Sequence, residues 1–225
     1  MASTPINVKL QPPKPRIRIM TPRISDAIKQ DHREIQAIYG RIASSTSRDE
    51  QIRYQNLFVW ELARHFVGEE IVVYPAFEKH LNNVGAGLAK KDREEHQAVK
   101  EQLKRFQALD PSNSDFIPTL TALMKDLMEH IKLEEGEDIV MLEEALSEHD
   151  SHSLSKAFNR TKIFIPSRAH PHAPNKPPFE TAVGLLTAPF DQVVDLFRKW
   201  PHKNEHHGQG QGQGQGQVQN QATTV

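Results

Sequence analysis

Two short motifs in the sequence each combine an imidazole with a carboxylate at a spacing that suits metal binding. His65 precedes Glu69 by four positions, and His130 precedes Glu134 by the same interval. Residues four apart lie side by side on a helix, although a single pair of this kind is more often a solvated surface contact. Here both pairs interrupt apolar stripes, where burying a carboxylate without a compensating cation is costly. The sequence therefore predicts that both pairs bind metal.

Two further histidines stand singly on the other apolar stripes. The predicted ligands are then His32, His65, Glu69, His96, His130 and Glu134. The chain has no cysteine, which excludes thiolate zinc sites, iron–sulfur clusters and disulfides. Imidazoles with carboxylates suit iron, manganese or zinc better than magnesium or calcium. If both carboxylates bridge, two ions are held, each with roughly one open position for O2, NO or peroxide.

Helical periodicity predicts the elements that carry these residues. Apolar stripes at helical spacing run through residues 24–42, 58–77, 88–106 and 120–142. Capping signals are expected at Thr21-Pro22, Ser47 and Ser114. A loop is expected over Asn82, Asn83, Gly85 and Gly87, and the fourth helix is expected to end near Glu148. Short connections between the helices predict an all-α, up-down antiparallel four-helix bundle.

Composition predicts the organisation around the bundle. We expect an N-terminal arm over residues 1–20, the bundle over 21–150, a C-terminal extension over 151–203 and a disordered Gly/Gln-rich tail over 204–225. The extension is expected to contain a short helical piece up to Phe158 and a Pro/His-rich strap over 166–178. Short helices between Thr181 and Trp200 are then expected to dock on the bundle.

Charge and hydropathy exclude several classes of partner. The formal net charge is -1, with acidic and basic residues interleaved, so neither nucleic acid nor a membrane surface is expected as a partner. No apolar run approaches the roughly 18 residues that span a bilayer, and no secretory signal is visible, so we expect a cytoplasmic protein. No nucleophilic triad, phosphate-binding glycine motif or nucleotide fingerprint is present.

Four segments together carry a resemblance to a known family. They are Asp31-His32, the run from His65 to Glu70 leading to Tyr74-Pro75, Glu94-Glu95-His96, and the run from His130 to Glu135. Through these segments, the chain resembles the hemerythrin-like HHE cation-binding family over about residues 24–145. Residues 166–181 are also similar to an extension found in fungal members of that family. The resemblance implies a di-iron four-helix bundle that binds O2 or NO, or that handles or senses iron.

The chain departs from the pattern of oxygen-carrying hemerythrins in two places. Asp92 stands where the first of two histidines in the third helix would be, and Glu134 replaces an aspartate at a shorter spacing. These changes favour the ferric state and argue against reversible O2 carriage. Asp92 has three open interpretations: a seventh ligand, an acceptor for an imidazole N–H, or a plain polar residue. Glu70 and Glu135 point a helical step away from the ligands and are interpreted as solvated groups or as groups behind the ligands.

The leading functional hypothesis is a binding protein that holds two iron ions and takes up O2, NO or peroxide as small ligands; no protein partner is predicted. One alternative is an enzyme in which the same centre turns over peroxide or oxidises a small substrate. Another is a metal-stabilised scaffold whose extension recruits a partner. The enzyme question stays open, with binding favoured.

Overall fold

The computed structural model describes residues 22–162 and 199–201, and within these ranges all regular structure is helical. The elements are α1 (Ile24–Ser44), α2 (Arg48–Gly68), η1 (Glu69–Val73), α3 (Tyr74–His80), α4 (Asn82–Gln107), α5 (Phe116–Leu133), η2 (Glu134–Asp138), α6 (Ile139–Ala145) and α7 (Glu148–Thr161). Each η element is one wide π-helical turn inside a longer helix, so α2, η1 and α3 form one rod and α5, η2 and α6 form another.

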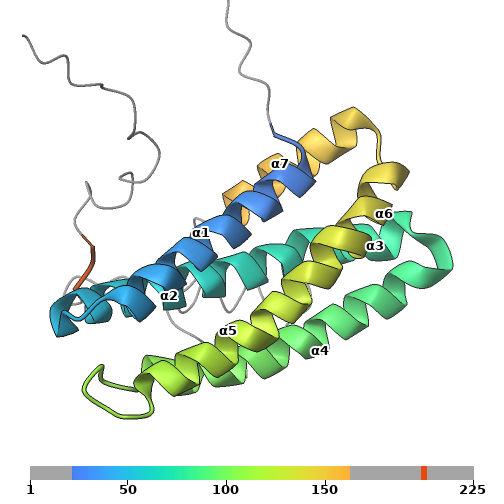
Figure 1. Ribbon diagram of the computed structural model, residues 1–225. Coiled ribbons are helices and arrows are strands. Elements are labelled where there is room, and N and C mark those ends of the chain that lie inside the picture. The colour runs from blue at the N-terminus through green and yellow to red at the C-terminus, as the bar shows by residue number, and fades with distance from the viewer. Residues whose placement is uncertain (1–21, 163–198, 202–225) are drawn as a thin grey trace, which may run out of the picture.

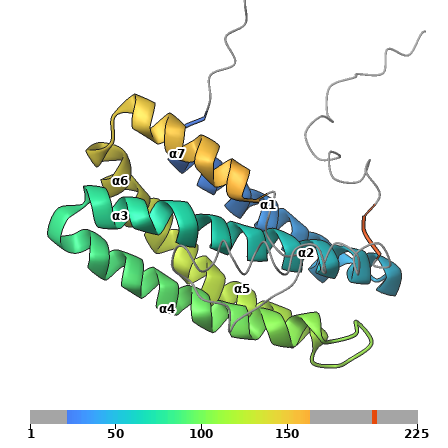
Figure 2. The same cartoon turned by 180° about the vertical axis from the view of Figure 1, so that it is seen from behind.

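The bundle has four rods, namely α1, α2–η1–α3, α4 and α5–η2–α6. They run up and down beside one another, as the short connections predicted (Figure 1). α1 packs on α2, α3 packs on α4, and α4 packs on α5, while α1 also contacts α5 and α6 to close the bundle. The added helix α7 lies along α1 and α2, on the side away from α4 and α5 (Figures 1 and 2). The predicted all-α bundle is confirmed, with a fifth helix against its outer face.

The start of α1 differs from the prediction. Pro22 lies outside the helix, and Arg23 occupies the N-cap position. The first backbone N–H groups find partners far away in the sequence: Ile24 donates to Ser151 Oγ at 3.1 Å and Ser25 donates to Glu143 Oε1 at 3.0 Å. These contacts satisfy donors that a local cap would otherwise serve. The start of α2 follows the prediction, because Ser47 Oγ accepts from the N–H of Glu50.

The loop expected over 82–87 is absent, because α4 begins at Asn82 and only Leu81 separates it from α3. Asn82 takes a positive φ of 49°, which makes the sharp reversal. Gly85 belongs to helix packing rather than to a turn: a Cβ atom there would lie 2.0 Å from the carbonyl oxygen of Phe77. The glycine thus allows α4 to pass directly against the backbone of α3.

Two boundaries of the later helices also differ from the prediction. Ser114 does not cap α5, which starts after Asp115, whose N–H donates to the side chain of Asn113. The fourth rod ends at Ala145, three residues before the expected end near Glu148, and Ser147 caps α7 by accepting from the N–H of Asp150. The helical piece expected up to Phe158 is therefore a separate helix that starts earlier and packs on the bundle.

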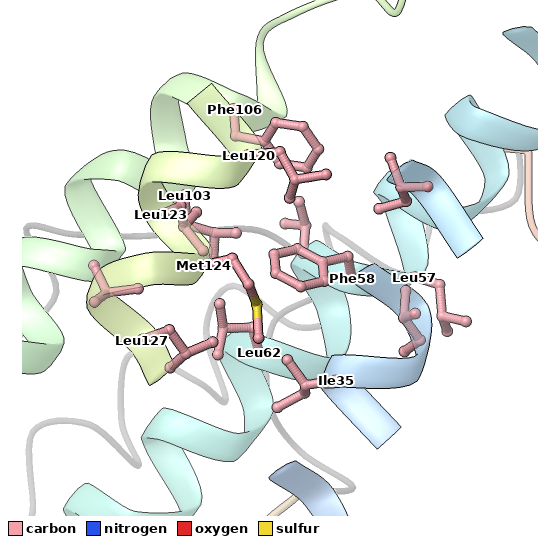
Figure 3. Packing of buried hydrophobic residues seen from close by; sticks show 14 of the residues in the cluster. Ile35, Leu57, Phe58, Leu62, Leu103, Phe106, Leu120, Leu123, Met124 and Leu127 are labelled. Atoms are coloured by element: carbon pink, nitrogen blue, oxygen red, sulfur yellow. The ribbon is translucent and has the colours of Figure 1, made fainter. Parts of the chain in front are cut away.

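Apolar side chains form two clusters along the bundle axis. The larger one fills the end near the α1–α2 and α4–α5 connections and contains Ile35, Phe58, Leu62, Phe106, Leu120 and Leu127 (Figure 3). The smaller one fills the other end and contains Ile28, Val73, Phe77, Leu142 and Phe158. On α1, His32 lies between Ile28 of one cluster and Ile35 of the other. A polar layer therefore separates two apolar layers.

Most of the predicted arm, strap, docking helices and tail lie outside the described residues. The short segment 199–201 does contact the bundle: the ring of Trp200 lies 5.9 Å from that of Trp60, and its carbonyl oxygen accepts from Arg53. Lys199 pairs with Asp49, and its carbonyl oxygen accepts from Asn56. The helices within the described ranges include none that is long and apolar enough to cross a membrane.

Candidate metal centre

The polar layer contains all six of the predicted ligand residues. His32 comes from α1, His65 from the last turn of α2, His96 from α4 and His130 from α5, while Glu69 and Glu134 are the first residues of η1 and η2. All six are buried. Four helical rods thus converge on one cluster, as the sequence predicted for their positions.

The four imidazoles form two pairs. Nε2 of His32 lies 3.0 Å from Nε2 of His65, and Nε2 of His96 lies 3.1 Å from Nε2 of His130. In both pairs the ring centroids are 4.7 Å apart and the rings meet edge to face. Two pairs of nitrogen donors therefore point at two separate places.

The two glutamates lie between these pairs. Glu69 Oε1 is 3.3 Å from His65 Nε2, and its other oxygen is 3.4 Å from His96 Nε2. Glu134 Oε2 is 3.3 Å from His32 Nε2 and 3.8 Å from His130 Nε2. Each carboxylate therefore reaches both imidazole pairs, which is the position of a bridge between two ions.

A further carboxylate stands behind each histidine. His32 Nδ1 contacts Glu135 at 2.7 Å and His130 Nδ1 contacts Glu95 at 2.8 Å, while His96 Nδ1 contacts Glu70 at 3.2 Å and His65 Nδ1 lies 3.5 Å from Asp31. Lys100 in turn pairs with both oxygens of Glu70. A carboxylate in this place fixes the ring orientation and keeps the proton on Nδ1.

A proton held on Nδ1 leaves a lone pair on Nε2 of the same ring, which a metal ion can accept. Burial lowers the pKa of His65 to about 4 and that of His96 well below its ordinary value, so both rings are neutral at pH 7. Burial also lowers the pKa of His130, but the carboxylates of Glu95, Glu134 and Asp92 together raise it above its ordinary value. Within each pair the two Nε2 atoms face each other at about 3 Å, a separation that needs either a shared proton or a cation between the nitrogens.

Three buried carboxylates in this layer have no hydrogen bond at either oxygen: Glu69, Glu134 and Asp92. Burial, together with the charge of Glu134, raises the pKa of Glu69 well above its ordinary value. Burial and the same charge raise the pKa of Asp92 to about 7. Buried oxygens without partners are costly, and a metal ion would satisfy them. The donor set therefore fits a cation site.

The structure adds Tyr74 to the predicted site residues and narrows the interpretations that were open for Glu70 and Asp92. The buried hydroxyl of Tyr74 lies 2.8 Å from His96 Nε2, which places a hydrogen-bonding group on one side of the centre. Glu70 is buried and paired, so the interpretation of this residue as solvated is wrong. Asp92 lies with Glu95 and His130 in a group whose ligand atoms are within 4.8 Å of one another. That proximity removes the interpretation of Asp92 as a plain polar residue.

The π-helical turns position the carboxylates of Glu69 and Glu134. In a π turn one extra residue enters the helix, and such turns are frequent at functional sites. The spacing of four is repeated through His65, Glu69, Val73 and Phe77, and through His130, Glu134, Asp138 and Leu142. A step of four overshoots the α-helical period of 3.6, so a wide turn is needed to keep the later residues facing inwards. This repeated step was the available sequence signal for η1 and η2.

Comparison with known proteins identifies the class. The profile of the hemerythrin HHE cation-binding domain matches residues 23–142, which include all six clustered residues. The chain belongs to this family, and the resemblance predicted from its motifs is confirmed.

Two relatives show how far the similarity extends. An uncharacterized hemerythrin-like protein of the fungus Schizosaccharomyces pombe is 55% identical over 179 residues, covering 80% of this chain and 88% of the relative. A protein of Nostoc named as a DNA nickase is 23% identical over 145 residues, covering 64% of this chain and 40% of that protein. No solved structure matches the chain.

Proposed function

We propose that the chain is a non-haem di-iron protein that binds O2, NO or peroxide at a metal position left open, or that uses the same centre to handle or sense iron. His32 and His65 would hold one ion, and His96 and His130 the other. Glu69 and Glu134 would bridge the two ions. The bound metals would supply Lewis acidity and redox chemistry, which the protein's own side chains lack.

The observation that carries this proposal is the convergence of four imidazole nitrogens, in two pairs, on two places in the polar layer. Carboxylates stand behind all four rings, and the two Nε2–Nε2 distances are 3.0 and 3.1 Å. Two nitrogens bound side by side to a six-coordinate ion, at about 2.1 Å each, would be separated by about 3.0 Å. Tetrahedral zinc would place them about 3.4 Å apart. The spacing is compatible with two adjacent nitrogens of one six-coordinate ion such as iron.

Metal analysis with an absorption spectrum tests this proposal. Protein purified after iron-replete expression is expected to contain about two iron ions per chain and to show the near-ultraviolet charge-transfer bands of ferric iron. Replacing His65 with Ala should remove at least one ion. His149→Ala provides the control, because that side chain is 89% exposed on α7. Stoichiometric zinc without iron, or no metal at all, would overturn the proposal.

The same preparation distinguishes binding from catalysis. A binding protein should change its spectrum once on addition of NO or peroxide and then stay unchanged. An enzyme of the oxidase or peroxidase type would consume peroxide over many turnovers per centre. Continuous O2 release or oxidation of an added substrate would therefore move the assignment to the enzyme class.

A further inference from the structure

The centre has an approximate internal two-fold symmetry. α1 with α2 and η1 matches α4 with α5 and η2: His32 corresponds to His96, His65 to His130 and Glu69 to Glu134. The supporting carboxylates follow the same relation, because Asp31 contacts His65 as Glu95 contacts His130, and Glu70 contacts His96 as Glu135 contacts His32. The residues at corresponding positions of the two halves can therefore be compared, and a position where the residue types differ needs a separate explanation.

One half contains polar residues where the other is apolar. Lys91 and Asp92 on α4 correspond to Ala27 and Ile28 on α1, and Asp138 on η2 corresponds to Val73 on η1. The apolar trio is buried in the smaller hydrophobic cluster. Its polar counterparts form, together with Glu95, what we call the α4–η2 seam. Packing alone would have been served equally well by apolar residues in both halves.

The seam already holds a cationic group between its carboxylates. Lys91 Nζ lies 3.5 Å from Asp92 Oδ1 and 3.5 Å from Asp138 Oδ2. Asp92 is fully buried, and neither of its oxygens has a hydrogen bond. The carboxylate oxygens of Asp92 and Glu95 and a ring nitrogen of His130 lie within 4.8 Å of one another. These groups could hold a metal ion in place of the ammonium group.

Exposure along the seam falls from the surface to the centre. The side chains of Lys91 and Glu95 are 39% and 33% exposed, that of Asp138 is 3% exposed, and that of Asp92 is fully buried. His130 and Glu134 of the centre come next, and Glu95 already contacts His130. Acidic groups thus form a continuous series from solvent to the predicted ligands.

The corresponding path in the other half is closed by α7. The ring of Phe158 is fully buried and lies 6.3 Å from that of His65. Gly68 permits this approach, because a Cβ atom there would lie 2.9 Å from the phenyl ring. Lys162 covers Asp31, the counterpart of Glu95, through contacts of 2.7 and 2.8 Å, and both side chains are largely buried.

From these observations we propose that the α4–η2 seam is a loading site for a divalent cation. Asp138, Glu95 and Asp92 take the ion from solvent, displace the ammonium group of Lys91 and pass the ion to His130 and Glu134. This inference rests on the proposed metal centre and adds the route by which the centre is filled. Charges near a binding site can change the association rate of an oppositely charged ligand by about 10-fold or more, so the three carboxylates of the seam should have a measurable effect on cation uptake.

The rate of metal uptake tests the inference. Metal-free full-length protein is mixed with Co²⁺ in a stopped-flow instrument, and uptake is followed by the visible absorption of bound cobalt. Asp138→Asn should slow uptake by about tenfold or more while the same number of ions is bound at the end. Lys91→Ala should speed uptake, because the competing ammonium group is gone. Glu94→Gln is the control, because it makes the same charge change as Asp138→Asn at a side chain of α4 that is 69% exposed and pairs with Lys90 outside the seam.

Each outcome has a distinct meaning. Uptake by Asp138→Asn at the wild-type rate, or equal slowing by Glu94→Gln, would overturn the loading site while leaving the centre intact. If Asp138→Asn does not fold, as judged by circular dichroism, the decision passes to Lys91→Ala, for which unchanged or slower uptake contradicts the inference. Wild-type protein that binds no Co²⁺ and no iron would overturn the proposed centre, and the loading site with it.

Discussion

Single residues behind the histidines determine how firmly the centre can hold a cation. The carboxylates of Glu135, Glu95 and Glu70 contact the Nδ1 atoms of three rings, and Asp31 lies slightly farther from the fourth. A ring held in this way loses little rotational freedom on binding metal and is the stronger base at Nε2. The strength of the centre therefore depends on residues that never touch the ion.

Glu135→Gln should weaken metal binding without abolishing it. The amide can still contact His32 but carries no charge, and loss of such a partner typically lowers metal affinity by about 10- to 100-fold. Competition with a chromophoric chelator measures the change. Glu137→Gln, at an exposed position of the same π turn, is the control. Equal affinities for the two variants would show that the contact of 2.7 Å has no influence on the centre.

The sequence could predict which residues gather at the centre, because ligands on apolar stripes are visible from spacing within one helix. It left Glu70 and Glu135 open between solvated groups and groups behind the ligands, and it missed Asp31 and Glu95 in this role, since each of these contacts joins two different helices. A signal was present: Asp31, Glu70, Glu95 and Glu135 each adjoin a predicted ligand in the chain. On a helix, the next residue lies about 100° around the axis and faces a neighbouring helix rather than its own site.

At the scale of elements, the close crossing of α3 and α4 depends on Gly85, which the sequence analysis placed in a loop. The side-chain contacts that anchor helix ends were equally hidden, because Ser151 and Glu143 are more than 100 positions from the start of α1 that they cap. Local periodicity predicts that a helix is present, whereas the first and last residues of these helices depend on contacts with distant parts of the chain.

Gly85→Ala and Gly87→Ala should have opposite effects. The added Cβ at Gly85 would lie 2.0 Å from a backbone oxygen of α3, which cannot move aside, so the free energy of unfolding should fall by about 3 kcal/mol. The added Cβ at Gly87 meets nothing within 4 Å, and alanine is the better helix former by about 1 kcal/mol. Urea denaturation of the metal-free variants measures both. Similar losses at the two positions would contradict the close crossing.

Glu143→Gln should make the free energy of unfolding less dependent on pH in the acid range. Although burial tends to raise the pKa of Glu143, hydrogen bonds from Ser25 and Ser151 and the charge of Arg23 hold this pKa below its ordinary value. A lowered carboxyl pKa adds stability that is fully present above the ordinary value of 4.5, and this addition is lost as the pH falls below 4.5 and through the lower pKa of the folded state.

The wild type should therefore be more stable than Glu143→Gln by about 1 kcal/mol at pH 7, the usual contribution of a helix cap, and this difference should shrink as the pH falls below 4.5. Denaturation curves over this range give the comparison, with the exposed neighbour Glu144 changed to Gln as the control. A difference that stays constant with pH would rule out the ionised carboxylate as the source of the effect.

At the scale of the whole molecule, the polar layer divides one core into two, so metal content should govern global stability. Binding to the native state adds about 4 kcal/mol at free metal concentrations 1,000-fold above Kd, or roughly 10 °C in Tm for a chain of this size. Calorimetry of metal-free and metal-loaded protein tests this expectation. Identical melting temperatures would show that the folded protein binds no metal in preference to the unfolded chain, against the proposed centre.

The two π turns should also be recognisable in the sequences of related genes. Each turn is one residue longer than the α-helical turn it replaces, so loss of a single codon within residues 70–73 or 135–138 would restore a regular helix. Phe77 and Leu142 would still face the core, because the remaining step from His65 or His130 is about three full turns of a regular helix. The core would therefore tolerate the deletion, but the turn that positions the preceding glutamate would be gone. Among related chains, a one-residue gap in either window should thus coincide with loss of that glutamate, and an alignment could identify chains that have lost the centre even where every histidine remains.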